Sequence, residues 1–231
     1  MSTVEIIKID DIISYIPSVE HPLSSDIGII KGDKHTYLFD VGSSFDDLDF
    51  LYSLPEDTII IVSHFHRDHT WWLTKHYPGE GEMLPNDKIS LSYKPIRAKK
   101  IYAGSHIGHY TPTATLVTEP ITIYDGVKLD IIPLRTSHTR GALALMVNDD
   151  FIFLGDATYP CLGNDKKPDY YNVQLLKDLI EQLKSLPANR CGLSHDHRFV
   201  RPKNVVLRQL EGVYNNRDPR SPYIKPNNSP I

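Results

Sequence analysis

The sequence predicts an α/β domain, in which helices cover β-sheets, over residues 1–214, followed by a proline-rich tail over residues 215–231. Runs rich in β-branched residues alternate with runs of helical period along the chain, which is the pattern of this class. A length of 231 residues is enough for one large domain or two small ones. Hydrophobic residues at 40% and charged residues at 23% are ordinary for a globular protein and argue against a disordered chain.

The N-terminal half is dominated by strand signals. Apolar and β-branched runs predict strands at residues 4–9, 27–31, 36–41 and 58–62. The last of these runs is apolar without interruption, as in a strand buried on both faces. A short helix is expected at residues 45–54, and another begins at Trp71. Residues 77–98 show no clear period, which predicts a long loop, and loops of that length are usually functional.

The C-terminal half adds further strands and the two clearest helices. Strands are expected at residues 101–103, 121–124, 127–133, 142–147, 151–154 and 190–194. Helices are expected at residues 169–186, where the apolar residues share one face, and at residues 202–214, which begin with proline. The tail from Asn215 contains four prolines and should be extended or loose, which leaves open an oligomer formed through it.

Composition indicates in which compartment the protein is expected and which classes of partner are not expected. No apolar run approaches the ~18–20 residues that span a bilayer, and the start shows no basic segment followed by an apolar one, so neither a membrane protein nor a signal peptide is expected. Two cysteines, Cys161 and Cys191, cannot form a disulfide framework, which favours a reducing cytoplasm. A net charge of −4 and a pI of about 6.2 argue against nucleic acid as a partner, because such binding needs a basic surface.

Four metal-ligand side chains occur within six residues, directly after the buried strand at 58–62. In an extended stretch His64 and His66 point to the same side, about 6.6 Å apart along the chain, so both imidazoles can reach one cation. Asp68 and His69 follow where the chain turns and can face a second position. Imidazole together with carboxylate suits Zn²⁺, with Fe or Mn as alternatives. The plain alternative is a polar loop with solvated histidines.

Three more candidate ligands each follow a predicted strand. They are His138, Asp156 and His195. Each by itself would more often be a capped or hydrogen-bonded polar residue. Together they predict a convergent rim of ligands at strand ends, where open α/β folds place their ligands.

In this order the residues resemble the five-motif pattern of the metallo-β-lactamase superfamily, over residues 26–200. The resemblance implies an αββα sandwich, two mixed β-sheets flanked by helices, with two Zn²⁺ ions at the sheet edges. It implies that the first metal is held by His64, His66 and His138. It implies that the second metal is held by Asp68, His69 and His195. Asp156 would bridge the two metals, and Asp40 would orient ligands without binding a metal itself.

Within the superfamily the chain is most similar to the quorum-quenching lactonases and to glyoxalase II, without the C-terminal helical domain of the latter. Asp156 supplies a bridging carboxylate that the true β-lactamases lack. The tetrad of His64, His66, Asp68 and His69 keeps the histidine that flavodiiron proteins replace by a carboxylate. As in the lactonases, Tyr159 follows Asp156 by three residues, which implies a hydroxyl facing the substrate carbonyl; the alternative is a packed aromatic residue. Trp71 and Trp72 replace the usual Gly-Gly, and we expect both in the core, with a place in the pocket wall as the alternative.

The function that this resemblance implies is hydrolysis of a small molecule at a dinuclear zinc site. A hydroxide that bridges the metals would attack the carbonyl of an ester, lactone or thioester, because metal coordination lowers the pKa of water to about 7. The residues expected to serve catalysis are Asp68, Asp156 and Tyr159. Two alternatives stay open: a metal-dependent phosphodiesterase or nuclease, and a non-catalytic metal-binding protein whose pocket is blocked.

Overall fold

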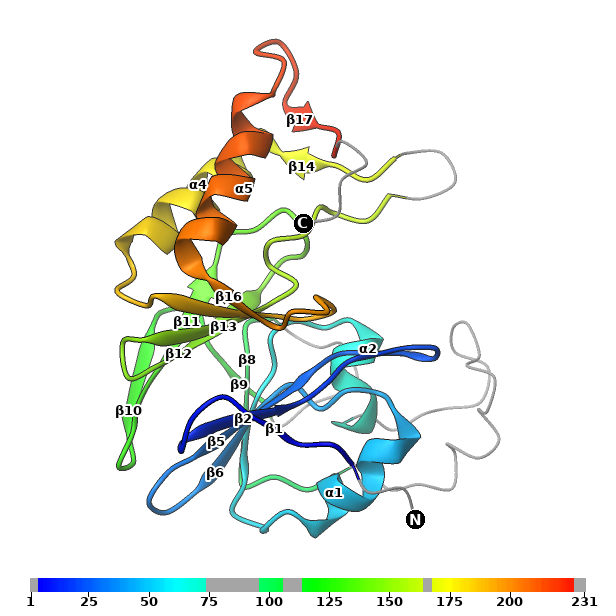
Figure 1. Ribbon diagram of the computed structural model, residues 1–231, viewed down its shortest axis with the longest axis vertical. Helices are drawn as coiled ribbons and strands as arrows, with labels where there is room; N and C mark the ends of the chain where they lie inside the picture. Colours follow the sequence, from blue (N-terminus) through cyan, green and yellow to red (C-terminus); the bar gives the residue numbers. More distant parts are fainter. Residues whose placement is uncertain (1–3, 74–95, 106–113, 164–167, 227–231) are drawn as a thin grey trace.

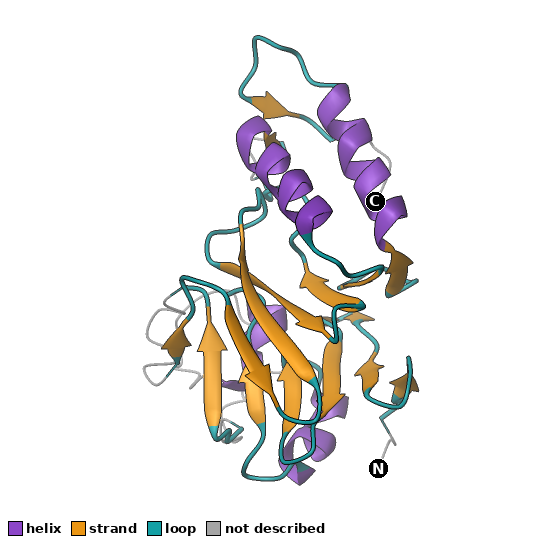
Figure 2. Cartoon of the chain, turned by 90° about the vertical axis from the view of Figure 1, so that its left-hand side faces the viewer, coloured by secondary structure: helices purple, strands orange, loops and turns teal. Residues whose placement is uncertain are grey.

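Two β-sheets pack face to face, and helices lie on both outer sides of this sandwich (Figures 1 and 2). The computed structural model describes residues 4–73, 96–105, 114–163 and 168–226. The expected αββα sandwich of two mixed sheets is therefore confirmed. Of the predicted loop at 77–98, only residues 96–98 are among those described.

The first sheet has its parallel strands in the middle and at one edge. Its strands are, in spatial order, β1 (Ile7–Lys8), β2 (Ile13–Ile16), β5 (Ile27–Lys31), β6 (Thr36–Phe39), β7 (Ile59–Ile61), β8 (Lys100–Ala103) and β9 (Thr115–Leu116). The β6, β7, β8 and β9 strands run parallel, so their carboxyl ends meet at one edge. The two segments that follow β6 and β7 at this edge carry the candidate residue Asp40 and the tetrad that starts at His64.

The second sheet is antiparallel except at one pair. Its strands are, in spatial order, β10 (Ile121–Tyr124), β11 (Lys128–Leu134), β12 (Ala142–Val147), β13 (Phe151–Gly155), β15 (Arg190–Leu193) and β16 (Val200–Pro202). The β13 and β15 strands are parallel, so their carboxyl ends also lie together. Every residue of β12 is buried, because this strand has one face against the first sheet and the other beneath helices.

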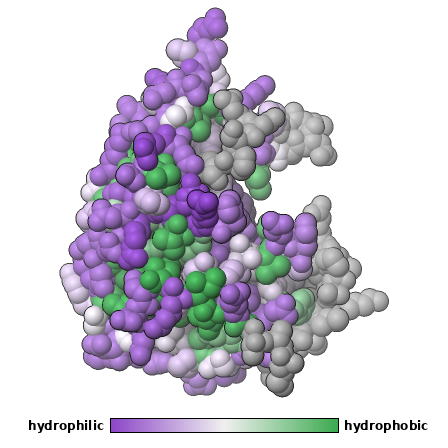
Figure 3. All heavy atoms as spheres, in the orientation of Figure 1, coloured by the Kyte–Doolittle hydropathy of each residue, from purple (hydrophilic) through white to green (hydrophobic). Residues whose placement is uncertain are grey.

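The helices divide into two groups. On the first sheet lie η1 (Phe45–Asp47), α1 (Leu48–Ser53), α2 (Arg67–Thr70) and η2 (Trp71–Leu73), and on the second lie α4 (Val173–Ser185) and α5 (Lys203–Asn215). The buried faces of α4 and α5 pack on the second sheet, and the surface over these helices is mainly hydrophilic (Figure 3). Within the described residues, no helix combines the length and the apolar character needed to cross a membrane.

Both tryptophans belong to the core beneath the first group of helices. The side chains of Trp71 and Trp72 are buried in one apolar cluster with Leu51 and Val62. The Trp72 indole donates a hydrogen bond to the carbonyl oxygen of Ser44 at 3.2 Å. The expectation that both rings are core residues is confirmed.

The clearest departures from the expected elements are short strands formed by distant segments. The helix expected at 169–186 begins only at Val173, because residues 171–172 form the strand β14 (Tyr171–Asn172). The Asn172 side chain then accepts the N–H of Leu175 at 3.0 Å and caps the helix. The hairpin of β3 (Val19–Glu20) and β4 (Leu23–Ser24) was likewise not expected.

The described part of the predicted tail begins with the last residue of α5 and continues through turns into one short strand that packs on the body of the domain. Residues 223–224 form β17 (Tyr223–Ile224), which pairs with β14 in an antiparallel way. The Ile224 side chain is buried in the cluster between the second sheet and its helices, whereas Tyr223 points outward. This packing joins the tail to the segment that follows Asp156 along the chain.

We expect Ile224→Ala to lower the free energy of unfolding by about 2–3 kcal/mol, because it removes a buried branched side chain and leaves a cavity. Ile224 is 6% exposed, and Tyr223 in the same strand is 52% exposed, so Tyr223→Ala is the matched control with a loss below about 1 kcal/mol. Urea denaturation of the full chain measures both. Equal losses for the two variants would show that Ile224 does not anchor the tail.

Candidate metal centre

Seven candidate ligands come from four segments that meet at one edge of the sandwich. The first sheet supplies the residues after β7, and the second sheet supplies one residue between β11 and β12 and one after each of β13 and β15. The structure brings together all of the residues that the sequence singled out as ligands: His64, His66, Asp68, His69, His138, Asp156 and His195. They form two groups of four that share Asp156, and within each group the ligand atoms lie within 4.8 Å of one another.

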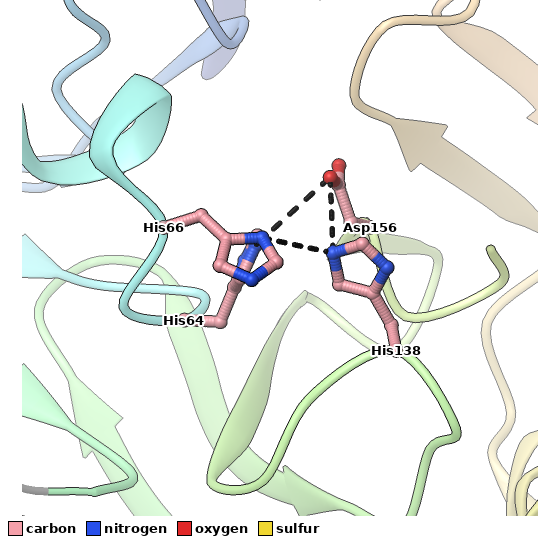
Figure 4. A group of neighbouring side chains, drawn as sticks. All are labelled: His64, His66, His138 and Asp156. Atoms are coloured by element: carbon pink, nitrogen blue, oxygen red, sulfur yellow. Dashed lines mark hydrogen bonds and ion pairs between the residues drawn. The ribbon is translucent and has the colours of Figure 1, made fainter. Parts of the chain in front are cut away.

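In the first group three imidazoles and one carboxylate point toward one another (Figure 4). The Nδ1 atom of His66 lies 2.9 Å from Nε2 of His64 and 3.1 Å from Nε2 of His138. Oδ2 of Asp156 lies 3.4 Å from the same His138 nitrogen and 3.9 Å from that of His64. Ligand atoms placed tetrahedrally at about 2.0–2.1 Å from Zn²⁺ are about 3.3–3.4 Å apart, so the spacing suits one cation.

The second group combines two imidazoles and two carboxylates. Nε2 of His195 lies 2.9 Å from Oδ2 of Asp68 and 3.9 Å from Oδ1 of Asp156. Nε2 of His69 lies 3.3 Å from Oδ2 of Asp68 and 3.4 Å from Oδ2 of Asp156. Asp156 thus faces both groups from the end of β13, which is the position that a shared ligand needs.

Hydrogen bonds behind the cluster fix which nitrogen of two histidines faces it. Nδ1 of His138 lies 2.9 Å from the carbonyl oxygen of Pro160, which can only accept, so this nitrogen carries the proton. Nδ1 of His69 donates in the same way to Oδ2 of Asp40 at 2.7 Å. In both rings the other nitrogen, Nε2, therefore faces the cluster, where its deprotonated form can bind a metal ion.

Asp40 and Ser63 tie the backbone of the tetrad to the first sheet. Asp40 is fully buried, and its second oxygen accepts the N–H of Ser63 at 2.7 Å. The Ser63 hydroxyl lies 2.9 Å from Nδ1 of His64 and 3.3 Å from Nδ1 of His69. The sequence singled out Asp40 but not Ser63, whose only signal is its place directly before His64.

The protonation states of three candidate ligands are those in which such side chains bind a cation. Burial lowers the pKa of His64 well below its ordinary value, and burial likewise lowers the pKa of His66, so both rings are neutral at neutral pH. Burial by itself would raise the pKa of Asp68, but the hydrogen bond with His195 and the nearby ring of His69 hold it well below its usual range. Neutral imidazoles and ionised carboxylates are the forms in which these groups bind metals.

Unlike His64 and His66, His69 has a raised pKa. Burial opposes its charged form, yet Asp156 and Asp40 raise the pKa of His69 well above its ordinary value. A proton on this ring therefore balances the two carboxylates when no cation is bound. A divalent cation in the second group would displace that proton and take over its role.

Two ligand atoms of the cluster are buried without a hydrogen-bond partner among the described residues. They are Nε2 of His69 and Oδ1 of Asp156, and both face the cluster. A buried polar atom left without a partner costs about 1–3 kcal/mol, so such atoms call for a ligand. The donors are nitrogen and oxygen without sulfur, a set that fits zinc, iron or manganese. The residues present therefore fit a pair of divalent cations.

Tyr159 lies beside the cluster but uses its hydroxyl on the protein. This hydroxyl donates to the carbonyl oxygen of Ser194 at 2.6 Å and so joins the segments that follow β13 and β15. Burial raises the pKa of Tyr159, so it keeps its proton at neutral pH. Donation to a substrate oxyanion, as the sequence predicts, requires the hydroxyl to turn away from Ser194.

Comparison with known proteins supports the fold. No family model matches the sequence, and no curated protein matches it. Among solved structures, a metallo-β-lactamase superfamily protein from the archaeon Sulfolobus tokodaii, ST1585, is 18% identical, with 90% of this chain and 88% of that chain covered and a TM-score of 0.57. The chemotaxis sensor ODP, in a peroxy diiron state, is 15% identical, with 90% and 94% covered and a TM-score of 0.60. The metallo-β-lactamase DIM-1 is 13% identical, with 93% and 98% covered and a TM-score of 0.60.

At these identities the likeness shows the fold alone, which is the metallo-β-lactamase fold. The chain thus combines this fold with a dinuclear-type cluster of histidine and aspartate side chains. The cluster lies where four strand ends meet, and its side chains could hold metal ions there.

Proposed function

We propose that this protein is a metal-dependent hydrolase of the metallo-β-lactamase superfamily that binds two divalent cations and cleaves an ester, lactone or thioester bond in a small molecule. The observation that carries the proposal is the position of Asp156, which belongs to both groups of candidate ligands. A carboxylate shared by two sites holds two cations close together. A pair of cations held in this way can activate both water and the bond to be cleaved, which supports hydrolysis as the proposed reaction.

The two cations divide the candidate ligands between them. The first is held by His64, His66 and His138, and the second by Asp68, His69 and His195, with Asp156 common to both. Zinc is the metal that we propose, with iron as the alternative, because one structural neighbour is described with a diiron species. When bound, the pair would supply Lewis-acid activation of the carbonyl and of water at neutral pH.

The side chains of the protein supply orientation and protons. Asp40 and Pro160 hold the rings of His69 and His138 so that their Nε2 atoms face the cluster. Tyr159 is the nearby proton donor, and we propose that its hydroxyl leaves Ser194 to donate to the developing oxyanion. Burial raises the pKa of the Cys191 thiol to about 12, so this cysteine is not a nucleophile.

The carbonyl substrate class rests on two features of the segment after β13. Asp156 supplies the shared carboxylate, and Tyr159 follows it at the spacing found in the lactonases that the sequence resembles. The hydrogen bond from the Tyr159 hydroxyl to the carbonyl oxygen of Ser194 holds this hydroxyl beside the residue that directly precedes His195. A phosphodiester substrate is the alternative that the same metal pair could serve.

We expect the protein loaded with Zn²⁺ to hydrolyse at least one member of a panel of lactones and thioesters, and to lose this activity in a chelator. Restoring Zn²⁺, Fe²⁺ or Mn²⁺ in separate samples identifies the metal that supports turnover. The panel also includes β-lactams and bis(p-nitrophenyl) phosphate. Hydrolysis of the phosphodiester alone would replace the proposal by the nuclease alternative, and no turnover with two metals bound would leave a non-catalytic metal-binding protein.

A further inference from the structure

Three successive polar residues are buried directly before β5. Ser24, Ser25 and Asp26 connect the β3–β4 hairpin to the first sheet, and Asp26 is only 3% exposed. Buried polar groups in folded proteins are almost always hydrogen-bonded, so their partners indicate what they do. Two hydrogen bonds of this segment reach the backbone of the metal cluster, and others join Ser24 and Asp26 to the backbone of residues 18, 43 and 44.

The carboxylate of Asp26 joins the first sheet to the candidate ligand at the end of β15. Its Oδ2 accepts the backbone N–H of His195 at 3.0 Å, and its Oδ1 accepts the N–H of Ser18 at 3.0 Å. Both oxygens are therefore used on main-chain donors. A hydrogen bond from an N–H to an ionised carboxylate is stronger than one between neutral groups.

The backbone of His195 needs such a partner. Its φ angle is +61°, in the left-handed region that residues other than glycine rarely adopt. Glycine would remove the strain but also the imidazole, so the conformation must be held by contacts. In this conformation Nε2 of His195 lies 2.9 Å from Oδ2 of Asp68.

The neighbouring residue holds a second ligand of the same group. The backbone N–H of Ser25 donates to the carbonyl oxygen of Asp68 at 2.9 Å. Ser25 and Asp26 thus hold Asp68 from the first sheet and His195 from the second. Across the described part of the chain, no hydrogen bond joins these two residues to His64, His66 or His138.

We propose that Asp26 is a positioning residue for one of the two metal sites. Through the backbone of His195 it sets the affinity for the cation held by Asp68, His69, His195 and Asp156, and leaves the affinity of the His64, His66 and His138 site unchanged. This inference rests on the metal-binding part of the proposed function. It is independent of which bond the protein hydrolyses.

Asp26→Asn tests the proposal with little change in shape. The amide keeps one acceptor but turns a donor toward one of the two backbone N–H groups, so one hydrogen bond is lost. The full-length metal-free protein is titrated with Zn²⁺ in competition with a chromophoric chelator, which resolves two binding steps in the wild type. We expect one step to weaken about 10–100-fold in the variant, as for other partners that orient metal ligands, and the other to stay within about twofold.

Asp125→Asn is the matched control. Asp125, in the β10–β11 turn, is also buried, and its carboxylate accepts the backbone N–H groups of Lys34 and His35 in the β5–β6 turn. This variant should lower the Tm while both Zn²⁺ affinities stay unchanged. Unchanged affinities in Asp26→Asn, or two steps weakened equally, would overturn the positioning role.

Two further measurements cover a variant that does not fold. Asp26→Ala removes both acceptors without placing a donor against the N–H groups, and the same loss of one step is expected. If it also fails to fold, hydrogen exchange of the His195 amide in the metal-free wild type decides. Exchange as slow as in the core strands supports the proposal, and exchange as fast as in an exposed loop overturns it. Wild-type protein that binds two Zn²⁺ without hydrolysing any substrate contradicts the proposed function only.

Discussion

Asp156→Ala should abolish hydrolysis and weaken the binding of both metal ions. The carboxylate faces Nε2 of His138 at 3.4 Å in one group and Nε2 of His69 at 3.4 Å in the other, so its removal opens both sites at once. Loss of several kcal/mol of transition-state stabilisation corresponds to a decrease in kcat/KM of about 10³-fold or more.

The measurement pairs steady-state kinetics with elemental analysis of the purified variant. Metal content should fall from about two ions per chain to one or fewer, whereas loss of any other single ligand should spare one site. Asp11→Ala is the control, because the Asp11 side chain is fully exposed and lies in the β1–β2 turn. Near-normal rates with Asp156→Ala would exclude this residue from the reaction.

The sequence predicted best those parts of the fold that are determined locally. The strand at residues 27–31 and the strand at residues 142–147 have the predicted limits, because their apolar runs are interrupted by turn residues on both sides. By contrast, Tyr171 and Asn172 lie in a stretch of helical pattern, and they form a strand only because Tyr223 and Ile224 pair with them. Pairing between distant segments leaves no periodic signal in either one.

The same distinction separates the candidate ligands from their supports. Spacing identified His64, His66, Asp68 and His69 because ligand chemistry and strand geometry act over a few residues. The contact that holds His195 joins it to Asp26, which is 169 positions away in the sequence. An aspartate before a strand has the same local pattern whether it ends a turn or holds a ligand. Asp40 was found beforehand only because the family resemblance implied it, whereas the role of Asp26 is visible only in the folded structure.

Gly155→Ala should lower the free energy of unfolding by about 4 kcal/mol and disrupt the metal cluster. Gly155 has a φ of +53°, where an alanine is strained by about 1–2 kcal/mol. A Cβ atom at this position would lie 2.8 Å from Cβ and 2.9 Å from Oγ of Ser63, and such overpacking costs about 1–3 kcal/mol. Urea denaturation of the metal-free protein measures the loss directly.

Ser63, whose side chain an added Cβ atom on Gly155 would meet, cannot move without breaking hydrogen bonds that hold the metal cluster. Ser63 donates its N–H to Asp40 and accepts the N–H of Leu143, while its hydroxyl contacts the ring of His64. An added methyl group therefore forces apart the two sheet edges that carry the two halves of the site, and metal affinity should fall together with stability. Gly212→Ala is the matched control, since no atom lies within 4 Å of its Cβ position in α5, and it should raise stability by about 0.5–1 kcal/mol. A Gly155→Ala protein as stable as the wild type, with both metal sites intact, would show that the sheets tolerate a wider gap at this edge.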